Sequence, residues 1–352
     1  MNAKKTLPLA LPALVLPLLA LSMRADEVSF HPAEGVTVNK ELNFNTTFYV
    51  DDLSVVVDGQ DMSGMLGEAM DEGLLIDATI DVTDEYVSAE AGKIVSLLRS
   101  YNSLSLEAGM ESDAEVVDDF AKLEDSAVSF KWDEETGEYV KAFHESTGDD
   151  DLLEKLTADM DFLALLPSGE VSEGDTWDVS ADDLASIFLP GGMVAAPSGD
   201  MEGQEEMAEL FEEELTSQLE DAFEDFMIQC KYIGTQDEDG VEVGKIEFKY
   251  EGNASIDLSN LIQEAIELQG DEMGIEADIT ATMDFEFDGE GVLLWNLKAG
   301  HTADFEMTGE ITVMADVEAD IDAMGESHTA EFSAEISGEA EWKMSATGDD
   351  EE

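Results

Sequence analysis

Apolar and polar residues alternate almost without a break over residues 274–346. A period of two puts one set of side chains on one face of a strand and the other set on the opposite face. A helix would instead carry the acidic residues on all sides, so these segments are predicted to be antiparallel strands with one solvated and one buried face. The apolar positions of the three successive runs are Ile275, Ala277, Ile279, Ala281, Met283, Phe285 and Phe287; Phe305, Met307, Ile311, Val313, Ala315, Val317 and Ile321; and Ala330, Phe332, Ala334, Ile336, Ala340, Trp342 and Met344.

Turns are predicted where the alternation breaks, at residues 288–291, 299–301 and 324–326, because each contains glycine, which accepts the positive φ of tight hairpins. The last two runs have opposite phases, so the numbers of paired residues must add to an odd sum. We predict a sum of 647, which pairs Ala315 with Phe332, Val313 with Ala334, Phe305 with Trp342 and Gly309 with Gly338. The runs are far longer than an ordinary strand of about five or six residues. The sheet is therefore expected to curl, with its bend at the facing glycines.

The rest of the chain is predicted to add further strands and several helices. Strands are expected at 41–57 with a break near Asp51 and Asp52, at 74–87, 93–106, 228–234 and 241–250, and in a hairpin of 128–132 and 139–143. Helices are expected at 149–166, from Ser180 or Asp182 to Phe188, at 205–227 and at 258–268. The predicted fold class is α+β: a large curled antiparallel sheet, like half of a barrel, with helices packed on its apolar face. Residues 26–352 would form one domain, with an N-terminal β layer at 40–145, a helical middle at 149–227 and long strands at 228–347.

The first 25 residues have the pattern of a secretory signal peptide. Lys4 and Lys5 precede an apolar run at residues 7–21, and cleavage is predicted after Ser22 or Ala25. A membrane anchor is the alternative, but the run is shorter than the roughly 20 residues that a spanning helix needs. No later stretch has the pattern of a spanning helix. The sequence therefore predicts an exported protein, in the periplasm or the medium, with no transmembrane segment after cleavage.

The excess of acidic over basic residues predicts a strongly negative protein surface. The chain has 86 acidic and 15 basic residues, and its net charge is −71. A disordered acidic chain is the alternative, but 43% of the residues are hydrophobic and follow a strict period. The acids therefore coat a folded surface whose self-repulsion is screened by salt, which predicts a saline habitat and lower stability at low salt. Binding to nucleic acid or to anionic head groups is not expected, because both require basic patches.

No catalytic residue, metal ligand or cofactor is predicted. Residues 235–240 resemble the start of a calcium loop, but Thr235 and Ile246 stand where that motif requires Asp and Glu, so a hairpin turn is predicted. Cys230 lies in an apolar strand and is predicted to be a buried structural residue. The histidines, of which the last two are predicted to be solvated turn residues, are His31, His144, His301 and His328.

Residues 166–177 contain a short recognisable motif, with the sequence LPSGEVSEGDTW. It resembles a segment found in uncharacterised exported β-rich bacterial proteins. These proteins are often likened to periplasmic lipoprotein carriers, in which helices close a curled sheet over an apolar cavity. The resemblance implies an apolar ligand and carries over no catalytic residue. From the residues themselves, the segment is predicted to be a turn that places Trp177 against the core.

Two functional hypotheses follow. In the first, the protein is a non-enzymatic binding or carrier module for a lipid or another apolar molecule; the alternative for the same residues is an ordinary packed core. In the second, it is a structural or interaction protein of the cell envelope that binds divalent cations loosely. An acid–base hydrolase is a third and weaker alternative. The residues predicted to line an apolar ligand site are Phe285, Phe287, Met307, Phe332, Trp342 and Met344.

Overall fold

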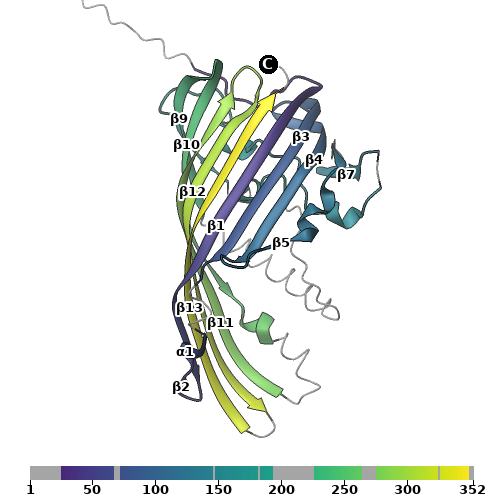
Figure 1. The fold of residues 1–352 in the computed structure, drawn as a ribbon. Helices are drawn as coiled ribbons and strands as arrows, with labels where there is room; N and C mark the ends of the chain where they lie inside the picture. Colours follow the sequence, from purple (N-terminus) through teal and green to yellow (C-terminus); the bar gives the residue numbers. More distant parts are fainter. Residues whose placement is uncertain are drawn as a thin grey trace, which may run out of the picture.

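The computed structural model describes residues 25–66, 72–145, 147–180, 183–192, 226–263, 275–323 and 326–348. Within these residues the strands form one antiparallel sheet in the order β7-β6-β4-β3-β1-β13-β12-β11-β10-β9-β8, with β2 beside β1 and β5 beside β4 (Figure 1). The first long strand pairs with the last, so the N-terminal and C-terminal strands are continuous parts of one sheet. The strands are β1 (Val36–Val57), β2 (Gln60–Asp61), β3 (Leu74–Glu90), β4 (Lys93–Met110), β5 (Glu115–Val116), β6 (Ala127–Asp133), β7 (Glu138–Phe143), β8 (Thr176–Val179), β9 (Met227–Glu238), β10 (Val241–Asp257), β11 (Ile275–Asn296), β12 (His301–Ala323) and β13 (Glu326–Gly348).

The predicted α+β class is wrong, because the described structure is nearly all β. Strands make up 67% of it and helices 9%, and no described helix has seven or more residues. The helical pieces are a run at residues 259–263, α1 (Ser63–Leu66), α2 (Leu184–Phe188) and the 3-10 helices η2 (Asp118–Leu123), η3 (Asp150–Leu153) and η4 (Leu163–Leu165). Most of the predicted helix at 205–227 lies outside the described residues; of its last two residues, Phe226 precedes a strand and Met227 begins β9. The predicted helix at 258–268 is described only to residue 263, and residues 259–263 are helical.

The predicted helix at 149–166 is replaced by two short 3-10 turns, joined by irregular chain with an isolated β-bridge from Leu156 to Gly192. Asp159 accepts hydrogen bonds from the backbone N–H groups of Asp161 and Leu163, at 2.7 and 3.0 Å. Phe162 has a left-handed backbone with φ 56°. Short acidic side chains compete in this way with helical hydrogen bonding. The leucines whose spacing suggested a helix belong instead to an irregular segment, and they pack into the core inside the curve of the sheet.

The alternation predicted the face of each residue correctly, but not every pairing. In β12 and β13 the paired numbers add to an odd sum, as predicted, but Ala315 pairs with Ala334 and Phe305 with Met344. The register predicted from the sum of 647 is therefore wrong by two residues. A slip by two leaves every side chain on the same face, so the pattern of apolar residues does not detect it. In β1, a bulge between Val50 and Asp52 changes the phase, which confirms the predicted break.

The predicted turn at residues 288–291 is also wrong, because β11 continues through it to Asn296. Its glycines make room for aromatic rings instead. A Cβ on Gly289 or Gly309 would overlap the ring or hydroxyl of Tyr250, and one on Gly291 would overlap Phe248. Gly309 faces Gly289 and Ala340, not Gly338 as predicted. Glycine inside a strand therefore marks a close approach of another side chain here.

The long strands divide the sheet into two parts along their length. In the proximal part, residues 149–180 and 183–192, which we call the interior segment, and the extended residues 26–32 fill the concave side. Inward residues such as Val82, Leu293 and Phe305 are buried there. The other part, which we call the distal sheet, consists of residues 47–57, 275–288, 310–323 and 326–339. Figure 1 shows these four strand segments continuing together beyond the proximal part and curving along their length.

Candidate functional site

A buried ionic cluster joins three strands to the interior segment of the proximal part. The Nζ of Lys40 lies 3.0 Å from Asp84 and 2.9 Å from Asp161, and it donates to the hydroxyl of Tyr86 at 2.8 Å. Arg99 donates to both carboxylate oxygens of Asp84, at 2.7 and 2.9 Å. The cluster is balanced in formal charge, with two cations and two carboxylates.

The electrostatics of this cluster follow from burial and pairing. Burial alone would raise the pKa of Asp84, but Arg99 and Lys40 outweigh it and hold that pKa below its ordinary value. Burial, together with the neighbouring Asp161, raises the pKa of Tyr86 well above its ordinary value. Burial and the charge of Asp161 raise the pKa of Asp159 to about 6.

The ionic cluster is suited to holding the fold rather than to catalysis. The side chains of Lys40, Asp84, Arg99 and Asp161 are all 0% exposed, so a substrate has no path to them. Thr302 adds a hydroxyl bond of 2.7 Å to the backbone oxygen of Asp161, which joins β12 to the same segment. This cluster was not predicted from the sequence. The available signal was a charged residue on the apolar phase of three strands: Lys40 between Val38 and Leu42, Asp84 between Val82 and Tyr86, and Arg99 between Leu97 and Tyr101.

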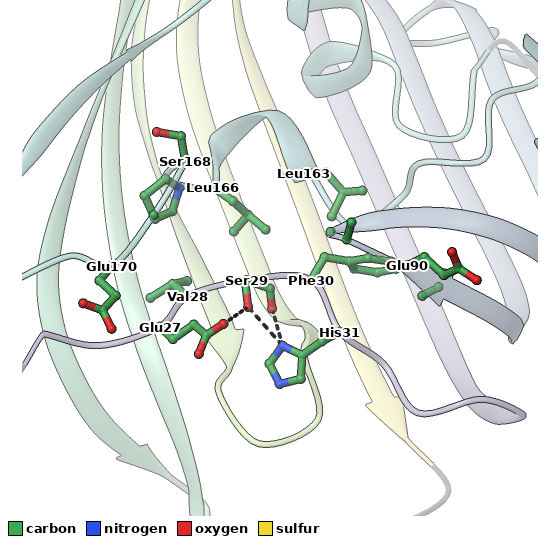
Figure 2. Close-up of a pocket in the computed structure, with 15 residues that line it drawn as sticks. Glu27, Val28, Ser29, Phe30, His31, Glu90, Leu163, Leu166, Ser168 and Glu170 are labelled. Atoms are coloured by element: carbon green, nitrogen blue, oxygen red, sulfur yellow. Dashed lines mark hydrogen bonds between the residues drawn. The ribbon is translucent and has the colours of Figure 1, made fainter. Parts of the chain in front are cut away.

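A hollow of about 720 Å³ opens at the rim of the proximal part (Figure 2). It is bordered by residues 27–31, the hairpin turn 89–92, Leu163 and residues 166–170. Glu27, Ser29 and His31 are close together there and superficially resemble a catalytic triad. Nδ1 of His31 lies 2.7 Å from the backbone oxygen of Ser29 and 3.2 Å from its hydroxyl, and that hydroxyl donates to Glu27 at 3.4 Å.

This arrangement lacks the order that nucleophilic catalysis requires. In a triad the acid orients the histidine, and the other ring nitrogen accepts the serine proton. Here the carboxylate contacts the serine, and a single histidine nitrogen faces both serine oxygens. If Nδ1 donates to the Ser29 carbonyl, it cannot at the same time accept a proton from the Ser29 hydroxyl. Glu27 and His31 are exposed, so solvent also competes for these bonds.

The apolar face of the distal sheet is the strongest candidate binding surface. Its inward side chains are half-buried, in contrast to the buried inward side chains of the proximal part. Ile279 and Ala281 are exceptions and are buried; the backbone of Ala281 bonds with Leu258 and with the hydroxyl of Ser259. Val57 at the end of β1 is exposed. The half-buried members of this face are Phe48, Val50, Leu53, Val55, Ala277, Met283, Phe285, Phe287, Ile311, Val313, Ala315, Val317, Ala319, Ile321, Ala330, Phe332, Ala334 and Ile336.

Aromatic rings separate the distal face from the packed proximal interior. Phe188 lies at the centre, with ring centroids 5.7 Å from Phe226, 5.4 Å from Tyr250 and 6.0 Å from Trp342. The group extends to Phe287, 6.1 Å from Phe226, and to Phe44, 4.8 Å from Trp342. Tilted and edge-on contacts at these distances are favourable. We call this group the aromatic floor: Phe44, Phe188, Phe226, Tyr250, Phe287 and Trp342.

The six residues predicted to line a ligand site fall into two groups. Met307, Trp342 and Met344 are buried in the proximal core, with 1%, 8% and 1% exposure. Phe285, Phe287 and Phe332 are half-buried on the distal face. The rings of Phe285 and Phe287 lie parallel on β11, with centroids 5.9 Å apart. In β13, Phe332 pairs with Val55 on one side and Val317 on the other.

Other residues singled out in the sequence have structural positions. Cys230 is buried, and burial raises its pKa to about 12, which makes the thiol inert. Trp177 packs on the core and donates to the backbone oxygen of Leu165 at 3.2 Å. Residues 237–240 form the predicted hairpin turn between β9 and β10. His328 faces Asp58 at an exposed position, whereas His301, predicted to be solvated, is 1% exposed and bonded to the backbone oxygen of Thr302.

No group of three or more His, Cys, Asp or Glu residues within the described ranges has the arrangement of a metal site. In the same part of the chain, no helix is long and apolar enough to cross a membrane.

Comparisons with known proteins add no family. No family model matches the chain, and no curated protein matches it. Among solved structures, similarity is found to an outer membrane channel of Pseudomonas putida F1, with a TM-score of 0.18, 9% identity and coverage of 91% of this chain and 98% of that chain. Pseudomonas aeruginosa OpdQ gives a TM-score of 0.17 at 8% identity, with 89% and 98% coverage, and P. aeruginosa OccK11 (OpdR) gives 0.17 at 8%, with 91% and 99%.

Proposed function

We propose that this protein is an exported, non-enzymatic binding or carrier protein that holds an apolar molecule on the apolar face of the distal sheet. The observation that carries the proposal is a change in the burial of inward-facing side chains along single strands. The apolar side chains of the same alternating pattern are buried at Phe305 and Met307 in β12 and only half-buried at Val313 and Val317 further along it. Solvated apolar patches of this kind are typical of binding surfaces.

The shape of the distal face suits an elongated apolar ligand. The face is continuous over four strands, and it ends at the aromatic floor, which blocks access to the proximal core. Phe285, Phe287 and Phe332 supply the largest apolar side chains on it. Full burial of one such side chain against a ligand contributes about 1.5–3 kcal/mol. A few of these contacts are enough for micromolar affinity after the costs of association.

The alternative function is that of a structural or interaction protein of the envelope with loose cation binding. It is favoured by rows of directly opposed acids on the outer face, such as Asp288, Glu310 and Glu339 on three adjacent strands. Like charges directly opposite each other are destabilising, so bound cations would relieve them. A calcium-dependent rise in Tm, beyond that produced by sodium or magnesium at equal ionic strength, would favour this alternative over the carrier.

The test of the carrier function uses the mature protein in 2 M NaCl and the neutral fluorescent probe N-phenyl-1-naphthylamine. We expect saturable binding near one probe per chain, with at least about tenfold weaker binding after Phe332→Ser. The matched control is Ser333→Ala, on the adjacent outward-facing position of the same strand, which should bind as the parent does. Circular dichroism must show that all three proteins are folded.

The absence of saturable binding would refute the proposal, and so would equal affinity in the parent and Phe332→Ser. Native mass spectrometry of protein purified from its own host in high salt provides a second readout. A co-purifying apolar molecule at near-stoichiometric amounts, lost in the Phe332→Ser variant, is the result that the carrier function predicts.

A further inference from the structure

We infer that the distal sheet selects its ligand by charge, and that the ligand is a single-chain amphiphile with a cationic head group. This inference rests on the proposed function, because it concerns the same apolar face. It adds the chemistry of the head group, which the apolar face alone does not specify. The reason lies on the opposite side of the same four strand segments.

The two faces of the distal sheet differ completely in character. Its four segments contain 16 Asp or Glu residues and no Lys or Arg. Most of the acids occupy the outward phase of the strands, opposite the apolar phase. They also stand in register across strands: Glu318 pairs with Glu331, and Asp278 pairs with Asp320. A sheet with this arrangement projects a strong negative potential through its own thickness.

The proximal part of the sheet does not share this imbalance. Its outer face carries lysines that pair with acids, at 2.8 Å for Lys245 with Glu247, 3.2 Å for Lys249 with Glu290 and 2.7 Å for Lys343 with Glu341. The negative field is therefore concentrated where the apolar face is half-exposed. The coincidence of these two features along the same strands is what points to a charged amphiphile.

The outer carboxylates lie close enough to the apolar face to affect the binding of a charged ligand there. Packed sheets lie about 10 Å apart, so a molecule packed on one face begins about 5 Å from the backbone of the sheet. The carboxylates extend a few ångströms from the backbone on the other side, which places them roughly 10 Å from such a ligand. This separation is close to the Debye length of about 10 Å at 0.1 M salt, and it is far beyond the roughly 3 Å at 1 M. The low-dielectric layer of apolar side chains between them weakens the interaction less than water would. Several acids act together on one head group, so their contributions add.

The aromatic floor supplies a second attraction for a cation. Phe44, Phe188 and Phe287 are half-buried members of the floor. Cations are attracted to the faces of aromatic rings, and this interaction is used widely to bind quaternary ammonium groups. The acids of the opposite face and the electron-rich faces of the rings would repel an anionic head group, and the four segments contain no Lys or Arg to bind it. Their one histidine, His328, lies 2.9 Å from Asp58.

The experiment compares three probes with the same dodecyl chain: dodecyltrimethylammonium, dodecyl maltoside and dodecyl sulfate. Each displaces the neutral fluorescent probe from the mature protein below its micelle concentration, at 0.2 M and 2 M NaCl. At 0.2 M NaCl we expect dodecyltrimethylammonium to bind at least about tenfold more tightly than dodecyl sulfate. The affinity of dodecyl maltoside should lie between the two. At 2 M NaCl the difference should shrink to about twofold, because the outer acids are then screened.

Two variants separate the proposed site from adsorption to an acidic surface. Glu318→Gln combined with Glu331→Gln removes an opposed pair on the outer face, and it should reduce the preference for the cation while leaving dodecyl maltoside unchanged. Phe332→Ser should weaken all three probes. If the cationic probe binds Phe332→Ser as tightly as the parent, it adsorbs to the outer acids, and the inference is overturned.

The remaining outcomes distinguish the inference from the function on which it rests. Equal binding of the three probes at 0.2 M, or tighter binding of dodecyl sulfate, would overturn the charge selectivity while the carrier function stands. If none of the three dodecyl compounds binds or displaces N-phenyl-1-naphthylamine, both the charge selectivity and the carrier function are overturned. Circular dichroism spectra at 0.2 M and 2 M NaCl must show that the protein is folded at both salt concentrations.

Discussion

Replacing Lys40 by Met should destabilise the protein severely, because it removes the cation of a buried ion pair. Lys40 Nζ makes three contacts of 3.0 Å or less, with Asp84, Asp161 and Tyr86, and its side chain is fully buried. Asp84 keeps both of its bonds to Arg99 in the variant. Asp161 keeps hydrogen bonds from Tyr86 and from the backbone of Thr302, but no cation. Leaving one buried charge unpaired in this way costs about 3–5 kcal/mol.

A double variant separates the loss of the ion pair from the loss of side-chain packing. In Lys40→Met with Asp161→Asn, no unpaired charge remains, and we expect about 1–3 kcal/mol less destabilisation than in Lys40→Met alone. The assay is urea unfolding in 2 M NaCl, followed by tryptophan fluorescence, with the free energy of unfolding taken from the midpoint and slope. A cost below about 1 kcal/mol for Lys40→Met would refute the reasoning. So would a double variant whose cost equals the sum of the two single variants.

Four further predictions follow from other positions. Tyr101→Phe should leave the Tm unchanged or raise it, because the Tyr101 hydroxyl is the one buried side-chain polar atom without a hydrogen-bond partner in the described structure, and removing such a group saves about 1–3 kcal/mol. Asp159 has a pKa of about 6 against an ordinary 3.8, so the folded state binds the extra proton and stability should fall as pH rises from about 4 to 6, by up to about 3 kcal/mol; Asp159→Asn should flatten this slope in urea midpoints measured at each pH. Gly309→Ala should cost about 1–3 kcal/mol in urea unfolding, because its methyl group would overlap the hydroxyl of Tyr250, whereas Gly169→Ala, which has open space around it, should be nearly neutral. Transfer from 2 M to 0.1 M NaCl should lower the Tm, because the opposed acids of the outer face lose their screening; a Tm independent of NaCl would contradict this.

Much of the sheet could be predicted because alternation is a local property of the chain. The strands at 74–90 and 93–110 and the hairpin of β6 and β7 all lie where their apolar period places them. The phase change at Asp51 and Asp52 also corresponds to a real bulge. Side-chain period determines the face of a residue directly, so these features need no knowledge of distant partners.

The errors occurred where distant residues decide the outcome. Gly289 and Gly291 suggested a turn, but the rings of Tyr250 and Phe248, from the neighbouring strand, explain why glycine is required there. The leucines at 152–166 suggested a helix, but the Asp159 carboxylate accepts backbone hydrogen bonds and the Asp161 carboxylate pairs with the buried Lys40 instead. The sequence shows neither the ring that will lie over a glycine nor the cation that will reach an aspartate.

The candidate binding surface was also predicted only in part. The sequence identified Phe285, Phe287 and Phe332 as apolar members of one face, and the structure places all three on the half-buried distal sheet. It grouped them with Met307, Trp342 and Met344, which have the same phase but lie in the packed part.

By itself, the sequence determined which residues share a face, because that depends only on strand periodicity, and it determined that the opposite face is acidic. The tertiary structure alone decided how far along each strand the apolar face is covered. That depends on where the interior segment and the aromatic rings pack, which is set by contacts between residues far apart in the chain. The separation of a sealed proximal core from a half-exposed distal face, on which the proposed function rests, is therefore a property of the folded molecule.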